Sequence, residues 1–225
     1  MLFVSFLNTI YLLSLERIKV SALKLIHLAN HKSTNVGNGA LIVGTERVLS
    51  EDLDCDVTFV SEPWDDYTFE LKQFDSNFVD LVNQSDGLIV GAAVTINGRH
   101  YLRNAGMRFD LPYELWPKIT KPIVFYGISY RVWPFQKYYH LDQFKKTMQY
   151  ILDSPNILFS VRNDGTKDWL ETLLGHRLDK IEVIPDPAFY VTTVDSWHSE
   201  LVAGKVNVII SLNNEDEIYR FGQGH

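Results

Sequence analysis

The chain has 225 residues, enough for one large domain, and its 46% hydrophobic and 13% aromatic content excludes a disordered protein. A formal net charge of -7 and scattered lysines and arginines argue against a nucleic-acid partner, which would need a basic face. The single cysteine, Cys55, excludes an intramolecular disulfide and a zinc site built from cysteines.

The amino-terminal run MLFVSFLNTIYLLSL is almost wholly apolar and carries no charge. It is shorter than the about 20 residues that a membrane span requires. No positively charged segment precedes it, as one would in a signal peptide. We therefore assign residues 1–22 as an apolar amino-terminal extension. It is a packed helix, a peripheral membrane contact or a segment upstream of the true start.

The next stretch has the pattern of the first turn of a βαβ unit. Residues 25–29 are an apolar run that suits a buried strand, a polar loop follows, and residues 40–48 are predicted to be a helix. Glycine allows a ligand close to the backbone, and free N–H groups at a helix start attract anions. A loop that serves only the fold is the alternative. The predicted substrate-binding residues of this loop are Asn35, Gly37, Asn38 and Gly39.

This loop matches neither of two common phosphate-binding motifs. Ile42 stands where the dinucleotide fingerprint G-x-G-x-x-G has its third glycine. Gly39 and Gly44 have the spacing of a P-loop, but Thr45 and Glu46 follow them where the motif has lysine and a hydroxyl residue. Nicotinamide and ATP chemistry are therefore disfavoured.

The rest of the chain alternates between predicted strands and helices. The predicted strands are residues 57–60, 87–90, 122–127, 156–161, 181–184 and 205–212. The predicted helices are residues 69–82, 141–152 and 169–174, and residues 61–67 are a predicted loop. Repeated strand–helix units with short polar turns imply an α/β fold with a doubly wound, mostly parallel sheet.

Two more places suit a ligand. The strand from residue 87 runs into a small-residue turn at Gly91, where the backbone can approach a substrate. Four basic residues then fall within ten positions and could form an anion site. The alternative is a loop exposed to solvent, because clustered charges usually lie on the protein surface. These basic residues are Arg99, His100, Arg103 and Arg108.

Arg162 and Asp186 are the best-placed charged residues at predicted strand ends. A guanidinium there can hold a phosphate or a carboxylate through two parallel hydrogen bonds. The alternative for Arg162 is an ion pair with Asp164 or Asp186 that fixes the loops. Asp186 stands between two prolines and could act as a base or accept a sugar hydroxyl, or instead cap the following segment.

No metal site is predicted. His27 and His31 are four residues apart, a spacing that serves a metal only on a helix, whereas here a strand becomes a loop. Ser129 lacks the second glycine of a G-x-S-x-G nucleophile motif.

Five segments, in this order, resemble the polysaccharide pyruvyl transferase family. They are residues 35–41 (NVGNGAL), 86–91 (DGLIVG), 122–128 (PIVFYGI), 159–166 (FSVRNDGT) and 183–188 (VIPDPA). The resemblance extends over roughly residues 23–213. It departs from the family pattern at Asn38, where members often have an acidic residue, and at residues 91–93, where they often have three glycines.

The resemblance implies a GT-B-like architecture of two Rossmann-like halves with the active site between them, of which this chain is the amino-terminal half. On this basis residues 23–203 are a Rossmann-like α/β domain, and residues 204–225 begin a truncated second α/β domain. The family's catalytic histidine and most donor-binding basic residues belong to the other half, so we assign no catalytic residue here.

The implied activity is transfer of a pyruvyl group from phosphoenolpyruvate to a sugar of a cell-surface polysaccharide, in exopolysaccharide and cell-wall biosynthesis. Phosphoenolpyruvate is the donor substrate and no cofactor is implied. The implied acceptor is a glycan or a lipid-linked sugar, in the cytoplasm or at the inner face of the membrane. The alternatives are a GT-B glycosyltransferase that uses a nucleotide sugar, and a non-catalytic remnant that binds a glycan or an anion.

Overall fold

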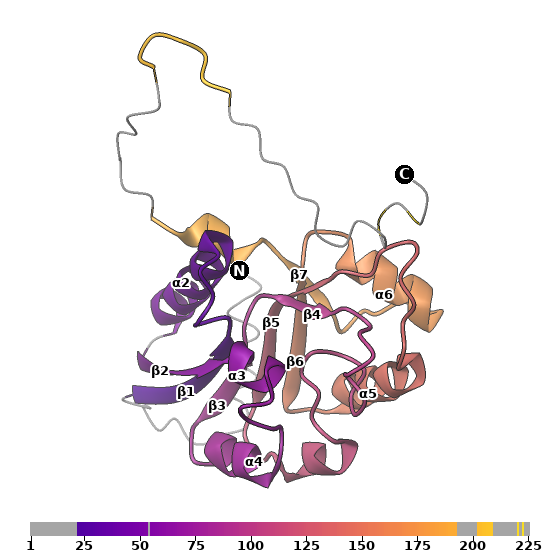
Figure 1. Ribbon diagram of the computed structural model, residues 1–225. Helices are drawn as coiled ribbons and strands as arrows, with labels where there is room; N and C mark the ends of the chain where they lie inside the picture. Colours follow the sequence, from indigo (N-terminus) through magenta and orange to yellow (C-terminus); the bar gives the residue numbers. More distant parts are fainter. Residues whose placement is uncertain (1–21, 54, 193–201, 209–219, 221, 223–225) are drawn as a thin grey trace.

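A parallel sheet of seven strands forms the centre of the protein (Figure 1). The computed structural model describes residues 22–53, 55–192 and 202–208, together with residues 220 and 222. The strand order is β2-β1-β3-β5-β6-β7, and β4 pairs with β5 beside this path. All of these pairings are parallel, and helices flank the sheet. The predicted α/β class and parallel sheet are confirmed, and the arrangement is consistent with a Rossmann-like fold.

The elements have the following bounds. The strands are β1 (Ala22–Ala29), β2 (Asp56–Pro63), β3 (Gly87–Val90), β4 (Val94–Ile96), β5 (Ile123–Tyr130), β6 (Ile157–Arg162) and β7 (Glu182–Ile184). The helices are α2 (Val36–Asp52), α3 (Trp64–Thr68), α4 (Ser76–Asn83), α5 (Leu141–Asp153) and α6 (Thr166–Leu174). Two 3-10 turns are η1 (Tyr113–Lys118) and η2 (Pro187–Tyr190).

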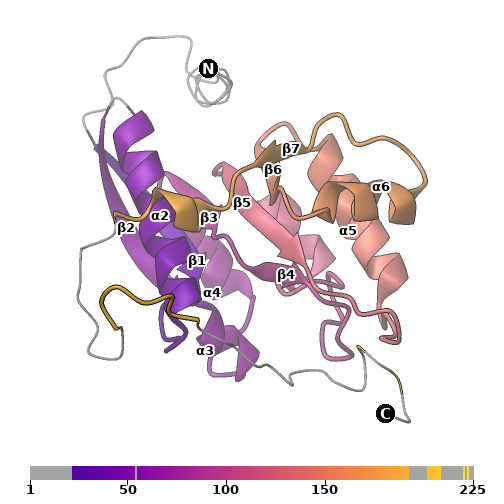
Figure 2. The same cartoon turned by 90° about the horizontal axis from the view of Figure 1, so that it is seen from above.

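Successive side chains of a strand point to opposite faces of the sheet, and the core divides accordingly. Ile26 and Leu28 of β1 belong to the larger core, to which α4, α5 and α6 contribute their apolar sides. Leu25, on the other face of β1, packs in a smaller cluster with residues of α2. Helix α2 is therefore separated from α5 and α6 by the sheet, as seen from above (Figure 2).

The strand order places a topological switch between β1 and β3. The chain passes from β1 to β2 on one side, and β3 then pairs with the other side of β1. In open α/β sheets, ligands bind outside the carboxyl ends of the strands at such a switch. The segments after β1 and β3 are therefore the favoured places for a site.

The start of α2 corrects one predicted boundary. A loop was expected up to Gly39, but the helix begins at Val36, since Asn35 caps it. The side-chain oxygen of Asn35 accepts the N–H of Gly37 at 2.8 Å. A capping oxygen satisfies a donor that has no partner within the helix, so it makes the earlier start favourable.

The region after β2 corrects two more boundaries. Residues 64–68, expected to lie mostly in a loop, form α3, and the helix predicted over residues 69–82 is reduced to α4. Asp75 caps α4 by accepting the N–H groups of Asn77 and Phe78. Glu70 has a φ of 58°, which no α-helix accommodates.

Asn35→Ala is expected to lower the free energy of unfolding by about 1 kcal/mol, because a helix donor loses its cap. Urea unfolding followed by circular dichroism measures the change. Asn35→Asp is the control, because it keeps an oxygen acceptor at the same place and should stay near the parent value. Equal losses in both variants would contradict the capping role.

Two predicted segments lie near the ends of the chain. The apolar run before β1 lies outside the described residues, and so does most of the strand predicted over residues 205–212. The described part of that stretch, residues 205–208, is not a strand. Among the described helices, none combines the length and apolar character needed to cross a membrane.

Candidate functional site

The predicted substrate loop forms the first turn of α2, at the carboxyl end of β1. The N–H of Asn35 and the side-chain amide of Asn38 both donate to the hydroxyl oxygen of Ser33, at 3.2 and 2.8 Å. Apart from the chain next to Gly39 and the backbone of its own helix, no described atom lies within 4 Å of the position that a Cβ on Gly39 would take, so the backbone is open to a ligand there. The segment is thus ordered, at a helix start and beside the switch, although substrate contact stays a prediction.

Gly91 directly follows β3, on the other side of the switch. Its N–H donates to the carbonyl of Leu28 at 2.9 Å. A Cβ added at Gly91 would lie only 2.5 Å from Nε2 of His27 and 3.0 Å from the Cβ of Ala29. The glycine is therefore explained by close packing against β1, and its predicted contact with substrate is untested.

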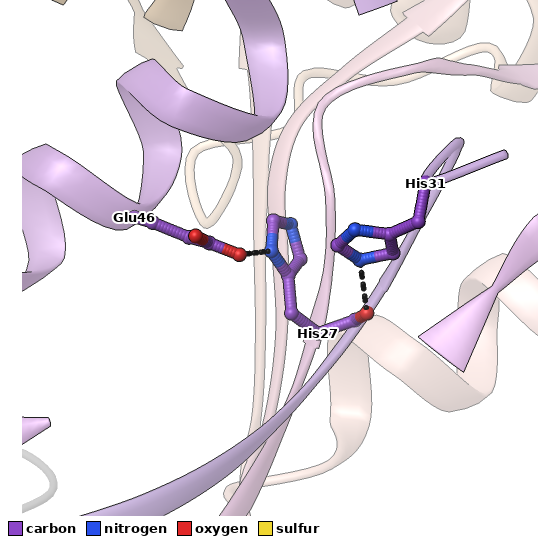
Figure 3. Close-up of side chains that lie close together, drawn as sticks. All are labelled: His27, His31 and Glu46. Atoms are coloured by element: carbon purple, nitrogen blue, oxygen red, sulfur yellow. Dashed lines mark hydrogen bonds and ion pairs between the residues drawn. The ribbon is translucent and has the colours of Figure 1, made fainter. Parts of the chain in front are cut away.

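A cluster of two histidines and a glutamate lies at the same switch (Figure 3). His27 of β1 is completely buried, and its Nδ1–H donates to Oε1 of Glu46 in α2 at 2.7 Å. His31, in the turn after β1, donates from Nε2 to the carbonyl of His27 at 2.9 Å. Burial is the main cause that lowers the pKa of His31, so its neutral form is favoured.

The turn after β1 brings the two imidazoles together. The N–H of His31 donates to the carbonyl of Ala29 at 2.9 Å, so the chain reverses direction at once. The two rings then meet edge to face, with centroids 5.1 Å apart. A helix is therefore not needed to bring two histidines with this spacing together. A strand followed by a tight turn also sets the rings side by side.

Arg162, at the end of β6, is an ion-pair partner in this structure. Its Nη1 donates to Oδ2 of Asp186 at 2.7 Å, and its Nε lies 3.7 Å from Oδ2 of Asp164. Its side chain is only 16% exposed. The ion-pair alternative predicted for this arginine is confirmed, and contact with an anionic substrate remains untested.

Asp186 caps the segment that follows it. Its Oδ1 accepts the N–H of Ala188 at 2.9 Å, at the start of η2. With Oδ2 bound to Arg162, both carboxylate oxygens have partners. The capping alternative is therefore confirmed, and this pair joins the ends of β6 and β7 to η2.

Sequence reasoning missed the role of Gly44, which was considered only for motif spacing. A Cβ at Gly44 would fall 1.9 Å from the carbonyl oxygen of Pro187, so α2 and η2 touch backbone to backbone. Arg47 of α2 reinforces the contact by donating from Nη1 to the carbonyl of Tyr190 at 3.0 Å. A glycine in the middle of a helix lowers its stability. The presence of Gly44 inside the predicted helix was therefore the one sequence signal that another backbone segment packs closely there.

Three of the four basic residues between β4 and η1 line two neighbouring hollows, which share Asn104 and Glu114. His100 and Arg108 line a hollow of about 1000 Å³, and Arg103 lines a different one of about 350 Å³. Burial lowers the pKa of Arg108, whose guanidinium lies 4.9 Å from the ring centroid of Trp64. Acidic residues also line the larger hollow, including Asp110 and Glu114, so it does not attract anions by charge alone.

A comparison with protein families identifies the chain. The family model described as "Polysaccharide pyruvyl transferase" matches residues 35–222. This match begins at the cap of α2 and contains all five segments on which the resemblance rests. A comparison with curated proteins gave no match. Because the family match covers most of the sequence, this chain belongs to the polysaccharide pyruvyl transferase family.

Proposed function

We propose that this chain provides part of a transferase that moves a pyruvyl group from phosphoenolpyruvate to two hydroxyls of a sugar on a cell-surface polysaccharide. The observation that carries the proposal is family membership over residues 35–222. The topological switch between β1 and β3 is compatible with it, because ligands of such sheets bind at this point.

The proposed chemistry needs an acid and an anion site. One sugar hydroxyl loses its proton to a base and adds to the enol phosphate carbon of phosphoenolpyruvate, while an acid protonates its methylene carbon. The second hydroxyl then displaces phosphate from the same carbon and closes a pyruvate ketal. Donors that hold the carboxylate and the phosphate stabilise the charge that develops.

This chain would contribute the anion site rather than the acid. The start of α2 offers N–H groups and the positive end of a helix dipole at the switch. Arg162 would add guanidinium donors that its partner Asp186 leaves unused. The acid belongs to the second Rossmann-like half of the proposed GT-B architecture.

The proposed acceptor is a glycan or a lipid-linked sugar. A lipid-linked acceptor would bring the enzyme to the inner face of the membrane, where the apolar residues before β1 could make a peripheral contact. Co-sedimentation with vesicles that carry the lipid-linked sugar tests this part separately.

Arg162→Ala is expected to weaken phosphoenolpyruvate binding at least tenfold, because an anion loses charge-assisted donors. The measurement is the rise in melting temperature with increasing phosphoenolpyruvate, each variant being compared with its own ligand-free value. Arg177→Ala is the matched control. Arg177 is an exposed arginine paired loosely with Asp179, so its removal should leave the ligand effect unchanged.

Three ligands separate the candidate activities. Protection by phosphoenolpyruvate supports the pyruvyl transferase, and protection by a nucleotide sugar instead supports the glycosyltransferase. Protection by glycan alone supports a binding remnant, since a ligand stabilises only what binds it. A ligand effect that is the same in Arg162→Ala and in the parent chain removes Arg162 from the anion site.

A further inference from the structure

We propose that His27, His31 and Glu46 form a binding site for a divalent transition-metal ion of the zinc type (Figure 3). One nitrogen of each imidazole and one carboxylate oxygen all lie within 4.8 Å of one another. The three side chains come from β1, the turn after it and the middle of α2. The site does not depend on the proposed transferase activity.

Side-chain rotations would bring the ligand atoms to coordination distance, because they already lie within 4.8 Å of one another. Zinc binds imidazole nitrogen and carboxylate oxygen at about 2.0–2.2 Å, which places tetrahedral ligand atoms roughly 3.3–3.6 Å apart. His27 Nδ1 and Glu46 Oε1, now 2.7 Å apart, would separate slightly. His31 is partly exposed, so its ring has room to move toward them.

The hydrogen bond of His31 determines which of its two ring nitrogens is free to bind a metal. Its Nε2–H donates to the carbonyl of His27, which leaves the lone pair of neutral imidazole on Nδ1. Metal-binding histidines almost always donate their other N–H to a carbonyl or a carboxylate in this way. The outer partner of this ligand is therefore already in place without a metal.

His27 and Glu46 also suit the role. Glu46 pairs with the buried imidazole, and within the described residues neither a lysine nor an arginine forms an ion pair with it. Nε2 of His27 is buried and has no hydrogen-bond partner in the described structure. A metal would take the place of the proton on Nδ1, and this free Nε2 can accept the displaced proton.

The ligand set favours one class of ion. Two imidazoles and a carboxylate suit zinc and its neighbours, whereas magnesium and calcium prefer oxygen ligands throughout. The side chain of Glu46 is 30% exposed, so an ion can enter from solvent. Three protein ligands leave a fourth position for water or for a ligand oxygen.

A bound ion would tie α2 to the end of β1 and fix the turn that leads to Asn35. That turn precedes the predicted substrate residues, so the ion would act on the position of this segment. Occupancy should therefore raise the melting temperature, because the ion binds the folded chain and the site is not assembled in the unfolded one.

The test uses the full, untagged chain after treatment with a chelator that is then removed. Zinc chloride is titrated in by calorimetry, with magnesium chloride as the comparison, and cobalt(II) is added separately for visible spectroscopy. We expect one equivalent of zinc to bind, no saturable magnesium binding, and the intense visible bands of tetrahedral cobalt(II).

His31→Ala and Glu46→Gln should each weaken zinc binding at least about tenfold, since replacing even an outer partner of a metal ligand costs 10–100-fold. Both residues are partly exposed, so the variants should fold, which far-ultraviolet circular dichroism checks. His176→Ala is the matched control, because His176 is an exposed histidine far along the chain.

Equal zinc affinity in all three variants would overturn the proposal, since zinc would then bind elsewhere. So would the absence of saturable zinc binding in the parent chain. A weak cobalt(II) spectrum of the octahedral type in the parent chain would also overturn the proposal.

Discussion

Gly44→Ala is expected to destabilise the protein by about 3 kcal/mol, as overpacking against a rigid neighbour does. The added methyl group would lie 1.9 Å from the carbonyl oxygen and 2.7 Å from the carbonyl carbon of Pro187. Both are backbone atoms, so no side-chain rotation can relieve the clash. Either α2 or η2 must move, and the bond from Arg47 to Tyr190 would be lost with the contact.

Gly39→Ala is the matched control on the same helix. Beyond its own helix, no atom of the described residues lies within 4 Å of its added Cβ, so only the helix propensity changes. Alanine in place of glycine stabilises a helix by up to about 1 kcal/mol. Urea unfolding of both variants should therefore give shifts of opposite sign. A Gly44→Ala variant as stable as Gly39→Ala would mean that α2 and η2 are not in contact.

Much of the fold could be predicted because several elements have strong local signals. The helix predicted over residues 141–152 matches α5 almost to the residue. The helix predicted to end at residue 174 does so, because Gly175 caps α6 in the left-handed conformation with a φ of 78°. Repeated strand–helix units then left a parallel, doubly wound sheet as the favoured arrangement.

The short elements could not be predicted from the same signals. Helix α3 has five residues and begins directly after β2, so it has too few turns for a periodic pattern. The helix predicted from residue 69 was too long, because the apolar spacing did not reveal that Asp75 starts the helix later. In both places tertiary packing and capping residues determine where the helix begins. The spacing of apolar residues in the sequence does not contain this information.

The places of the candidate residues at strand ends were predictable, whereas their contact with a substrate stays a prediction. Asn35, Gly91, Arg162 and Asp186 all follow or end strands, and the carboxyl ends of parallel strands meet at one edge of the sheet. The pairing of Arg162 with Asp186, 24 residues apart, was foreseen as an alternative for this reason.

The contacts of α2 were not predictable, because they depend on how the helix is rotated above the sheet. His27 and Glu46 are 19 residues apart, and they meet only because His27 points to the face that α2 covers. Gly44 meets Pro187, which lies after the last strand of the described sheet. Periodicity within one helix does not tell which residues far along the chain that helix will contact.

Gly91→Ala is expected to cost about 2 kcal/mol, because its methyl group would overlap the buried ring of His27. The distance to Nε2 would be 2.5 Å, and the ring cannot swing away without losing its bond to Glu46. Urea unfolding in the presence of a chelator measures the loss free of any contribution from bound metal.

A double-mutant cycle identifies the cause of that loss. His27→Ala alone removes the ring and leaves room beside residue 91, so the Gly91→Ala change should cost little in that background. We expect a coupling of about 1–2 kcal/mol between the two sites, within the range found for residues in contact. Additive losses would instead mean that Gly91 is required for a reason other than His27. The remaining neighbour within 3.0 Å of the added methyl group, Ala29, would then be the next residue to vary.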